Sequence, residues 1–240
     1  MTPGTSRRAL ALAGQQRIYG TYGNGDMTTS ALDETRTGGD EQPQPQEGIG
    51  AGRAFSWLLV VCGALGLLAS WVIVIDKFKL LEDPNFVPGC SLNPIISCGN
   101  IMKSAQSHVF GFPNPMIGMV AYPVVICVGA GILAGARYRR WFWLGLQGGT
   151  LFGVGFVTWL QYQSLYSIGS LCLWCSLAWV ITIALFWYTG VHNIKHGVIP
   201  VPERARDLIL EFHWVVPVLW YGIIATLILT RWWSYWSTLL

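Results

Sequence analysis

The stretch LCLWCSLAWVITIALFWYTG, residues 171–190, carries no charged side chain and is long enough to cross a membrane. A helix rises 1.5 Å per residue and the hydrocarbon core is about 30 Å thick, so about 20 apolar residues span it. Similar stretches lie at about 54–75, 116–136, 141–163 and 213–230. Of the 240 residues, 52% are hydrophobic and 11% are charged, whereas soluble domains have about 25% charged residues. The sequence therefore predicts an all-α integral membrane protein, with a four-helix transmembrane bundle and a fifth transmembrane helix.

Residues 1–50 differ from the rest of the chain, because they are rich in Gly, Gln, Thr and Pro and lack apolar clusters. Such a segment buries too little apolar surface to offset the entropy of ordering, so we expect a disordered tail. The predicted organisation is this tail, a four-helix bundle over 51–190 with an outer loop at 76–115, and a segment over 191–240 that holds a loop and the fifth helix.

The third predicted span, 141–163, is rich in glycine. Small residues let helices approach closely in lipid. We therefore expect this span to pack tightly through its glycines, Gly148, Gly149, Gly153 and Gly155.

The positive charges indicate the orientation of the spans. Lys and Arg residues of short cytoplasmic loops outnumber those of external loops. They lie here before the first span, between the second and third, and between the fourth and fifth: Arg53, Arg137, Arg139, Arg140, Lys195, Arg204 and Arg206. The N-terminus is thus predicted in the cytoplasm and the C-terminus outside. The net charge is only +3 and no basic patch carries interleaved aromatics, so the sequence does not suggest nucleic acid as a partner.

This topology divides the six cysteines into two groups. Cys62 and Cys127 lie within spans, where a thiol packs as a small apolar side chain. The other four are predicted on the outer, oxidising side, where disulfides persist. They are Cys90 and Cys98 in the outer loop, and Cys172 and Cys175 at the outer end of the fourth span.

Three interpretations of these four cysteines compete: structural disulfides, a thiolate metal site, and a relay by thiol–disulfide exchange. Seven residues separate Cys90 from Cys98, more than in usual zinc pairs, and no His adjoins either pair. Cys172 and Cys175 share one helical face, with Cys172 in the first turn near water and Cys175 deeper. Exposed N–H groups of a first turn stabilise a thiolate. The relay is therefore favoured, and a structural or metal-binding membrane protein remains the alternative.

The outer loop includes VPGCSLNPIISCGNIMKSAQSHVFGFPNPMIG, residues 87–118. Its segment NIMKSAQS, residues 100–107, predicts a short amphipathic helix in the membrane interface, with Met102 toward the membrane and Gln106 toward water. Such a helix would hold Cys98 near the fourth span and leave Cys90 more exposed.

These residues together resemble a known family. The segment CSLNPIISCG (90–99), then Ser104, then FGFPNPMIG (110–118), then a late CxxC that opens a span, is similar to the vitamin K epoxide reductase family. The resemblance covers about 54–190 and is strongest to bacterial members of the actinobacterial type, which have five spans and no fused thioredoxin domain. It implies a multi-pass protein of the bacterial plasma membrane.

The resemblance also implies roles for the four outer cysteines. Cys172 and Cys175 would be the catalytic pair, and Cys175 would pass electrons to a quinone, either menaquinone or ubiquinone, with no metal involved. Cys98 would exchange with Cys172. Cys90 would accept electrons from a secreted or membrane-anchored thioredoxin-like dithiol protein. The implied product is a protein disulfide.

Three further residues are implied near the quinone. Asn114 would donate a hydrogen bond to a quinone carbonyl, and Tyr122 matches the family pattern. Trp179 stands four positions after Cys175, where animal members have a Tyr whose hydroxyl contacts the quinone. An indole N–H donates but cannot accept.

Overall fold

The computed structural model describes residues 48–93 and 95–237, and this part of the chain is helical with no extended strands. Most of the tail predicted over 1–50 lies outside the described residues. Its last residues pair with the bundle, because Ile49 and Tyr138 exchange two backbone hydrogen bonds of 2.8 and 3.1 Å. The all-α membrane class predicted from the sequence is confirmed.

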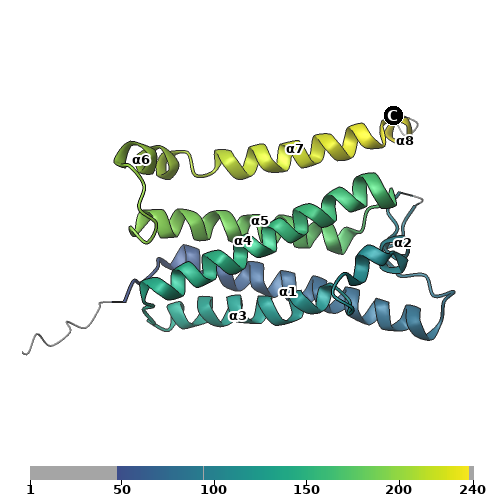
Figure 1. Ribbon diagram of the computed structural model, residues 1–240, viewed down its shortest axis with the longest axis horizontal. Coiled ribbons are helices and arrows are strands. Elements are labelled where there is room, and N and C mark those ends of the chain that lie inside the picture. Colours follow the sequence, from purple (N-terminus) through teal and green to yellow (C-terminus); the bar gives the residue numbers. More distant parts are fainter. Residues whose placement is uncertain (1–47, 94, 238–240) are drawn as a thin grey trace, which may run out of the picture. The chain divides into compact units, whose positions relative to one another are not determined.

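Five long helices account for the predicted apolar segments (Figure 1): α1 Arg53–Glu82, α3 Pro115–Leu133, α4 Arg140–Tyr162, α5 Leu173–Lys195 and α7 Val215–Arg231. Shorter helices join them: α2 Cys98–Lys103, η1 Ala105–His108, the π-helix η2 Gln163–Ile168, α6 Glu203–Glu211 and α8 Trp233–Trp236.

Three of the long helices can each cross a membrane by length and composition. They are α1, α3 and α5, with mean hydropathies of 2.7, 2.2 and 1.5. Helices α6 and α7 meet the same criterion together and are bent by 61°, so up to four spans result. Helix α4 has 23 residues, but its glycines and glutamines lower its hydropathy, and it packs against α5. The first, second and fourth predicted spans thus lie in strongly apolar helices, whereas the third lies in a weakly apolar one.

Glycines bring α1 and α3 into close contact. A Cβ atom on Gly63 would lie 2.7 Å from Ile126, and one on Gly129 would lie 2.9 Å from the Ser56 carbonyl oxygen. A Cβ atom on Gly66 would overlap the ring of Tyr122. These positions therefore fix the α1–α3 distance, as small residues do in lipid.

The same packing role, predicted for four glycines of α4, is wrong for three of them and holds for Gly153. A Cβ atom on Gly148, Gly149 or Gly155 would meet nothing within 4 Å, and one on Gly153 would contact only Thr182, at 3.1 Å. Gly148, Gly149 and Gly155 leave space, whereas Gly153 lets α4 approach α5; helix α4 meets α5 but stands away from α3.

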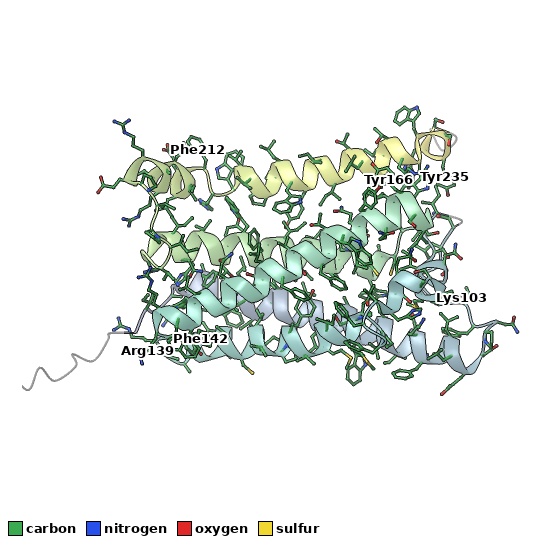
Figure 2. All side chains as sticks on the ribbon, viewed as in Figure 1. Lys103, Arg139, Phe142, Tyr166, Phe212 and Tyr235 are labelled. Carbon is green, nitrogen blue, oxygen red and sulfur yellow. A yellow bond between two sulfur atoms is a disulfide. The ribbon has the colours of Figure 1, made fainter. Side chains whose placement is uncertain are left out.

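Figure 2 shows which labelled side chains lie at each end of the helices. Lys103, Tyr166 and Tyr235 lie at one end, and Arg139 and Phe142 lie at the other. The first end carries α2, η2 and α8, together with the cysteines of the outer loop. The second carries the Arg137–Arg140 turn between α3 and α4.

Candidate functional site

Two loops that are distant in sequence meet at the cysteine end. Ile96 forms a parallel bridge with Leu171, because the Leu171 N–H donates to the Ile95 carbonyl at 2.8 Å and the Ser97 N–H donates to the Leu171 carbonyl at 2.9 Å. Cys98 lies two residues after Ile96, and Cys172 directly follows Leu171. The pairing therefore sets the two cysteines side by side.

A hydrogen bond between side chains strengthens this junction. Asn100 donates through Nδ2 to the Ser170 hydroxyl at 3.1 Å. The hydroxyl of Ser97 accepts from the Asn100 N–H at 3.4 Å and caps α2. Helix α2 therefore begins two residues earlier than the predicted helix at 100–107. Ser104 ends it, because its hydroxyl donates to the Ile101 carbonyl at 2.7 Å.

Three of the four outer sulfurs form a compact group. Cys90 and Cys98 are joined in a disulfide, whereas Cys172 and Cys175 are free thiols. The Sγ atoms of Cys90, Cys98 and Cys172 all lie within 4.8 Å of one another. A thiolate at Cys172 is thus within a short movement of the loop disulfide, as exchange through a mixed disulfide requires.

The burial of these sulfurs differs from the sequence-based expectation. Cys90 is 6% exposed, Cys98 is 0% and Cys172 is 1%. The prediction that Cys172 faces water is wrong, because the outer loop covers it. Cys90 is scarcely more exposed than Cys98, since it packs with Ile73, Leu80 and Met102. The predicted topology indicated on which side of the membrane these cysteines lie, but not that the outer loop covers them.

The start of α5 stabilises a thiolate at Cys172. This residue is the N-cap of α5, and its sulfur accepts a hydrogen bond from the Cys175 N–H at 3.4 Å. The Cys175 thiol and the N–H groups of Cys175 and Trp174 lower the pKa of Cys172 below the usual cysteine value, although burial and the charge of Asp76 oppose this. A lower pKa leaves more thiolate, which is the nucleophile of exchange.

A titration tests this cause. Replacing Cys175 with Ala removes the thiol donor, so the pKa of Cys172 is expected to rise. The thiolate of the wild-type protein then persists to lower pH than that of the variant as the pH falls. The measurement is the ultraviolet absorbance of the thiolate during a pH titration, corrected with a Cys172→Ser variant. Equal midpoints in wild-type and Cys175→Ala protein would contradict the assignment, and Cys62→Ala serves as the control.

A cavity of about 900 Å³ reaches Cys175 and lies among α1, α3, α4, α5 and the outer loop. Its lining is predominantly apolar and includes Cys175 but not the other three outer cysteines. Exposed side chains border it on two helices, Val120 and Val124 on α3, and Trp141 and Phe152 on α4. The cavity is therefore open between α3 and α4, toward the region of the lipid.

All three non-cysteine residues predicted near a quinone line this cavity: Asn114, Tyr122 and Trp179. Asn114 is buried and joins the loop to α3. Its Nδ2 donates to the Gln106 carbonyl at 2.7 Å and its Oδ1 accepts from the Val109 N–H at 3.1 Å. An amide nitrogen has two hydrogens, so one donor remains for a ligand. Gln106 also lines the cavity and is half-buried.

The hydroxyl group of Tyr122 is already engaged. It lies 3.0 Å from the hydroxyl of Thr182. Thr182 donates its one hydrogen to the Ala178 carbonyl at 2.7 Å, so Tyr122 must be the donor in the pair. Toward the cavity, the Tyr122 oxygen is thus an acceptor. Thr182 was not found from the sequence, because its partner is 60 residues away.

Trp179 lies one helical turn below Cys175 and is 4% exposed. It borders the cavity and also packs in a cluster with Leu165, Leu171 and Trp232. Trp179 therefore separates the cavity from the end of α7.

A lysine holds the outer loop over the cavity. Lys77, near the end of α1, donates through Nζ to the Met102 carbonyl and, at 3.4 Å, to the Ser107 hydroxyl. Phe110 of the same loop contacts Phe156 of α4, with ring centroids 5.7 Å apart. The loop thus bridges α1 and α4.

These features define a class: a multi-pass membrane protein with a disulfide, an adjacent thiol pair and an apolar cavity reached by one of the thiols. The model of the vitamin K epoxide reductase family matches residues 57–190. This is more than half of the chain, and the chain belongs to this family. A search of the curated proteins found no match.

Family membership and the cysteines make the chain a membrane thiol oxidoreductase, of a family whose enzymes use quinones. The match ends within α5. Helices α6, α7 and α8 lie outside it.

Proposed function

We propose that the chain oxidises a thioredoxin-like dithiol protein on the outer side of a bacterial plasma membrane and passes the electrons to a quinone in the cavity. One observation supports this most strongly. The Cys172 sulfur adjoins the loop disulfide, whereas Cys175, three residues further on, lines the apolar cavity. One cysteine pair therefore connects the external disulfide with a space for an apolar acceptor.

The proposed steps balance in electrons and protons. The partner's dithiol reduces Cys90–Cys98 and leaves as a disulfide. The loop dithiol reduces a Cys172–Cys175 disulfide through a Cys98–Cys172 mixed disulfide. The Cys172–Cys175 dithiol then gives two electrons and two protons to the quinone, which becomes a quinol. The structure holds an oxidised loop pair and a reduced helix pair, which is the state before quinone reduction.

The protein side of the cavity suits a quinone, either menaquinone or ubiquinone. Its apolar lining binds a ring and an isoprenoid chain, and the opening between α3 and α4 admits a molecule from the bilayer. Asn114 offers a hydrogen-bond donor for a carbonyl. The outer loop covers the site and keeps water from it.

The same three sulfurs raise the alternative of a metal site. Cys90, Cys98 and Cys172 are close enough to bind one ion after reduction of the loop disulfide. The disulfide, however, leaves Cys172 as the one free thiol among the three, which favours exchange. A metal-binding protein would take up about one equivalent of zinc with loss of its free thiols. The relay predicts quinone reduction without zinc.

The test is quinone reduction by the purified full-length chain, supplied with a reduced dithiol protein and a soluble quinone. We expect one partner disulfide to form for each quinone that is reduced, with quinone loss measured by absorbance. No quinone loss in a bilayer-like environment would overturn the proposal.

A cavity-filling variant tests where the quinone binds. Gly149 lines the cavity and a Cβ atom there would meet no atom within 4 Å, so the side chain of Gly149→Leu starts in open space and reduces the room for a ligand. We expect KM for the quinone to rise about tenfold or more. Gly148→Leu is the matched control, because Gly148 is equally free but does not line the cavity. Equal kinetics of both variants would exclude this cavity.

A further inference from the structure

The end of α7 contacts the loops that carry the cysteines, although α7 lies outside the segment that matches the family. Arg231 is its last residue, and Arg231 Nε donates to the carbonyl oxygen of Leu165 at 3.0 Å. Leu165 lies in η2, the π-helix just before the CxxC segment. The Arg231 side chain therefore ties α7 to the turn that leads to Cys172.

The next residue, Trp232, is buried at the same place. It is 8% exposed and packs in a cluster with Ile95, Leu165, Leu171 and Trp179. Ile95 and Leu171 share a backbone hydrogen bond in the bridge that sets Cys98 beside Cys172. Cys175 also packs against this cluster. The indole of Trp232 thus supports the junction of the two cysteine loops.

Contacts along the rest of α7 are sparse. Within α7 itself, all of which the structure describes, Pro217 alone is buried, and side chains such as Leu219 and Ile223 are exposed. Toward the inner end, the Trp187 indole donates to the His213 carbonyl at 2.6 Å, and Tyr221 donates to the Val180 carbonyl at 2.8 Å. The one buried residue within α7 therefore lies near its first turn, whereas Trp232, directly after its last residue, is buried beside the redox loops. Figure 2 shows Tyr235, just beyond this point, at the same end as Tyr166 of η2.

We propose that Arg231 and Trp232 are positioning residues that hold the Leu171–Cys172 segment against Cys98. Thiol–disulfide exchange needs close approach of two sulfurs, and a displacement of about 1 Å can cost a factor of about 10² in a positioned reaction. The fifth helix is in this view part of the redox site. The effect on turnover rests on the proposed function, but the effect on the cysteines does not.

The test isolates the two sulfurs. In a full-length chain with Cys90→Ala and Cys175→Ala, Cys98 and Cys172 remain as the exchanging pair. Their disulfide is equilibrated with a glutathione redox buffer and quantified by mass spectrometry. Trp232→Ala is expected to lower the equilibrium constant for this disulfide about tenfold, because the effective concentration of one sulfur at the other falls. Trp232→Phe restores most of it.

The matched control is Trp233→Ala, since Trp233 is the adjacent residue and is 61% exposed. Arg231→Gln, which loses the bond to the Leu165 carbonyl, is the milder second variant and is expected to lower the constant in the same direction. Equal constants for Trp232→Ala, Arg231→Gln and Trp233→Ala would overturn the proposal. A fall for Trp232→Ala and Arg231→Gln supports it even if the wild-type chain reduces no quinone, so the two proposals fail separately.

Discussion

Replacement of Cys175 with Ala is expected to lower the rate of quinone reduction by about 10³-fold or more, whichever dithiol supplies the electrons. Cys175 is the one outer cysteine that lines the cavity, so no other sulfur is placed to reduce an acceptor there. Removal of the reacting nucleophile from a covalent mechanism usually costs at least this much. The measurement is the initial rate of quinone loss with purified chain, at equal protein and saturating dithiol.

The controls for this substitution are Cys62→Ala and Cys127→Ala. Both are free thiols in the long helices α1 and α3 and neither lines the cavity, so their rates should stay close to wild type. A Cys98–Cys172 disulfide should still form in the Cys175→Ala protein under an oxidising buffer, because those two sulfurs remain adjacent. Unchanged turnover of Cys175→Ala would remove this cysteine from the electron path.

The helices could be predicted because each depends on nearby residues. A run such as 171–190 has no charge, and this alone predicts a helix that can cross lipid. The residues at which a helix begins and ends also depend on local side chains. Ser97 precedes α2 with a hydroxyl that caps it, so the sequence already indicated a start at Cys98 instead of residue 100.

The arrangement of the site depended on pairings across the chain, which no local pattern reveals. Ile96 pairs with Leu171, 75 positions later, and this pairing brings Cys98 to Cys172. The sequence grouped the four cysteines on one side of the membrane, but it could not show that Cys90, Cys98 and Cys172 are buried together under the outer loop. It also could not indicate that Lys77 anchors the loop through a backbone carbonyl.

The glycines of α4 illustrate why composition alone was ambiguous. A glycine permits close approach, as at Gly63 and Gly129, or it leaves a space, as at Gly149. Which of the two occurs depends on the residue that faces it on the neighbouring helix. Gly63 and Gly129 face atoms of the neighbouring helix, whereas Gly149 faces the open cavity.

Replacement of Cys90 with Ala is expected to separate two electron sources. Turnover with a protein dithiol should fall by about 10²-fold or more, because the proposed entry sulfur is lost. Turnover with a small dithiol should change only a few-fold, because such a reagent reduces the Cys172–Cys175 disulfide without the loop pair. The measurement compares quinone reduction with the two donors in the same preparations. Thermal unfolding of each preparation controls for loss of the loop disulfide.

The burial of Cys90 makes the first half of this prediction, on the protein dithiol, the more demanding one. At 6% exposed, the sulfur is reached only if the partner displaces part of the loop, so size and shape of the donor matter. A partner with one cysteine replaced should form a mixed disulfide with the wild-type chain, and peptide mapping should place it on Cys90. An equal loss of turnover with both donors would indicate that the Cys90–Cys98 disulfide is structural. A mixed disulfide on Cys98 would instead make Cys98 the entry sulfur and Cys90 the one that exchanges with Cys172. We expect turnover to fall far more with the protein dithiol than with the small dithiol, and the partner to be attached at Cys90. Both results together are what we expect if Cys90–Cys98 is a buried disulfide that the partner reaches by displacing part of the loop.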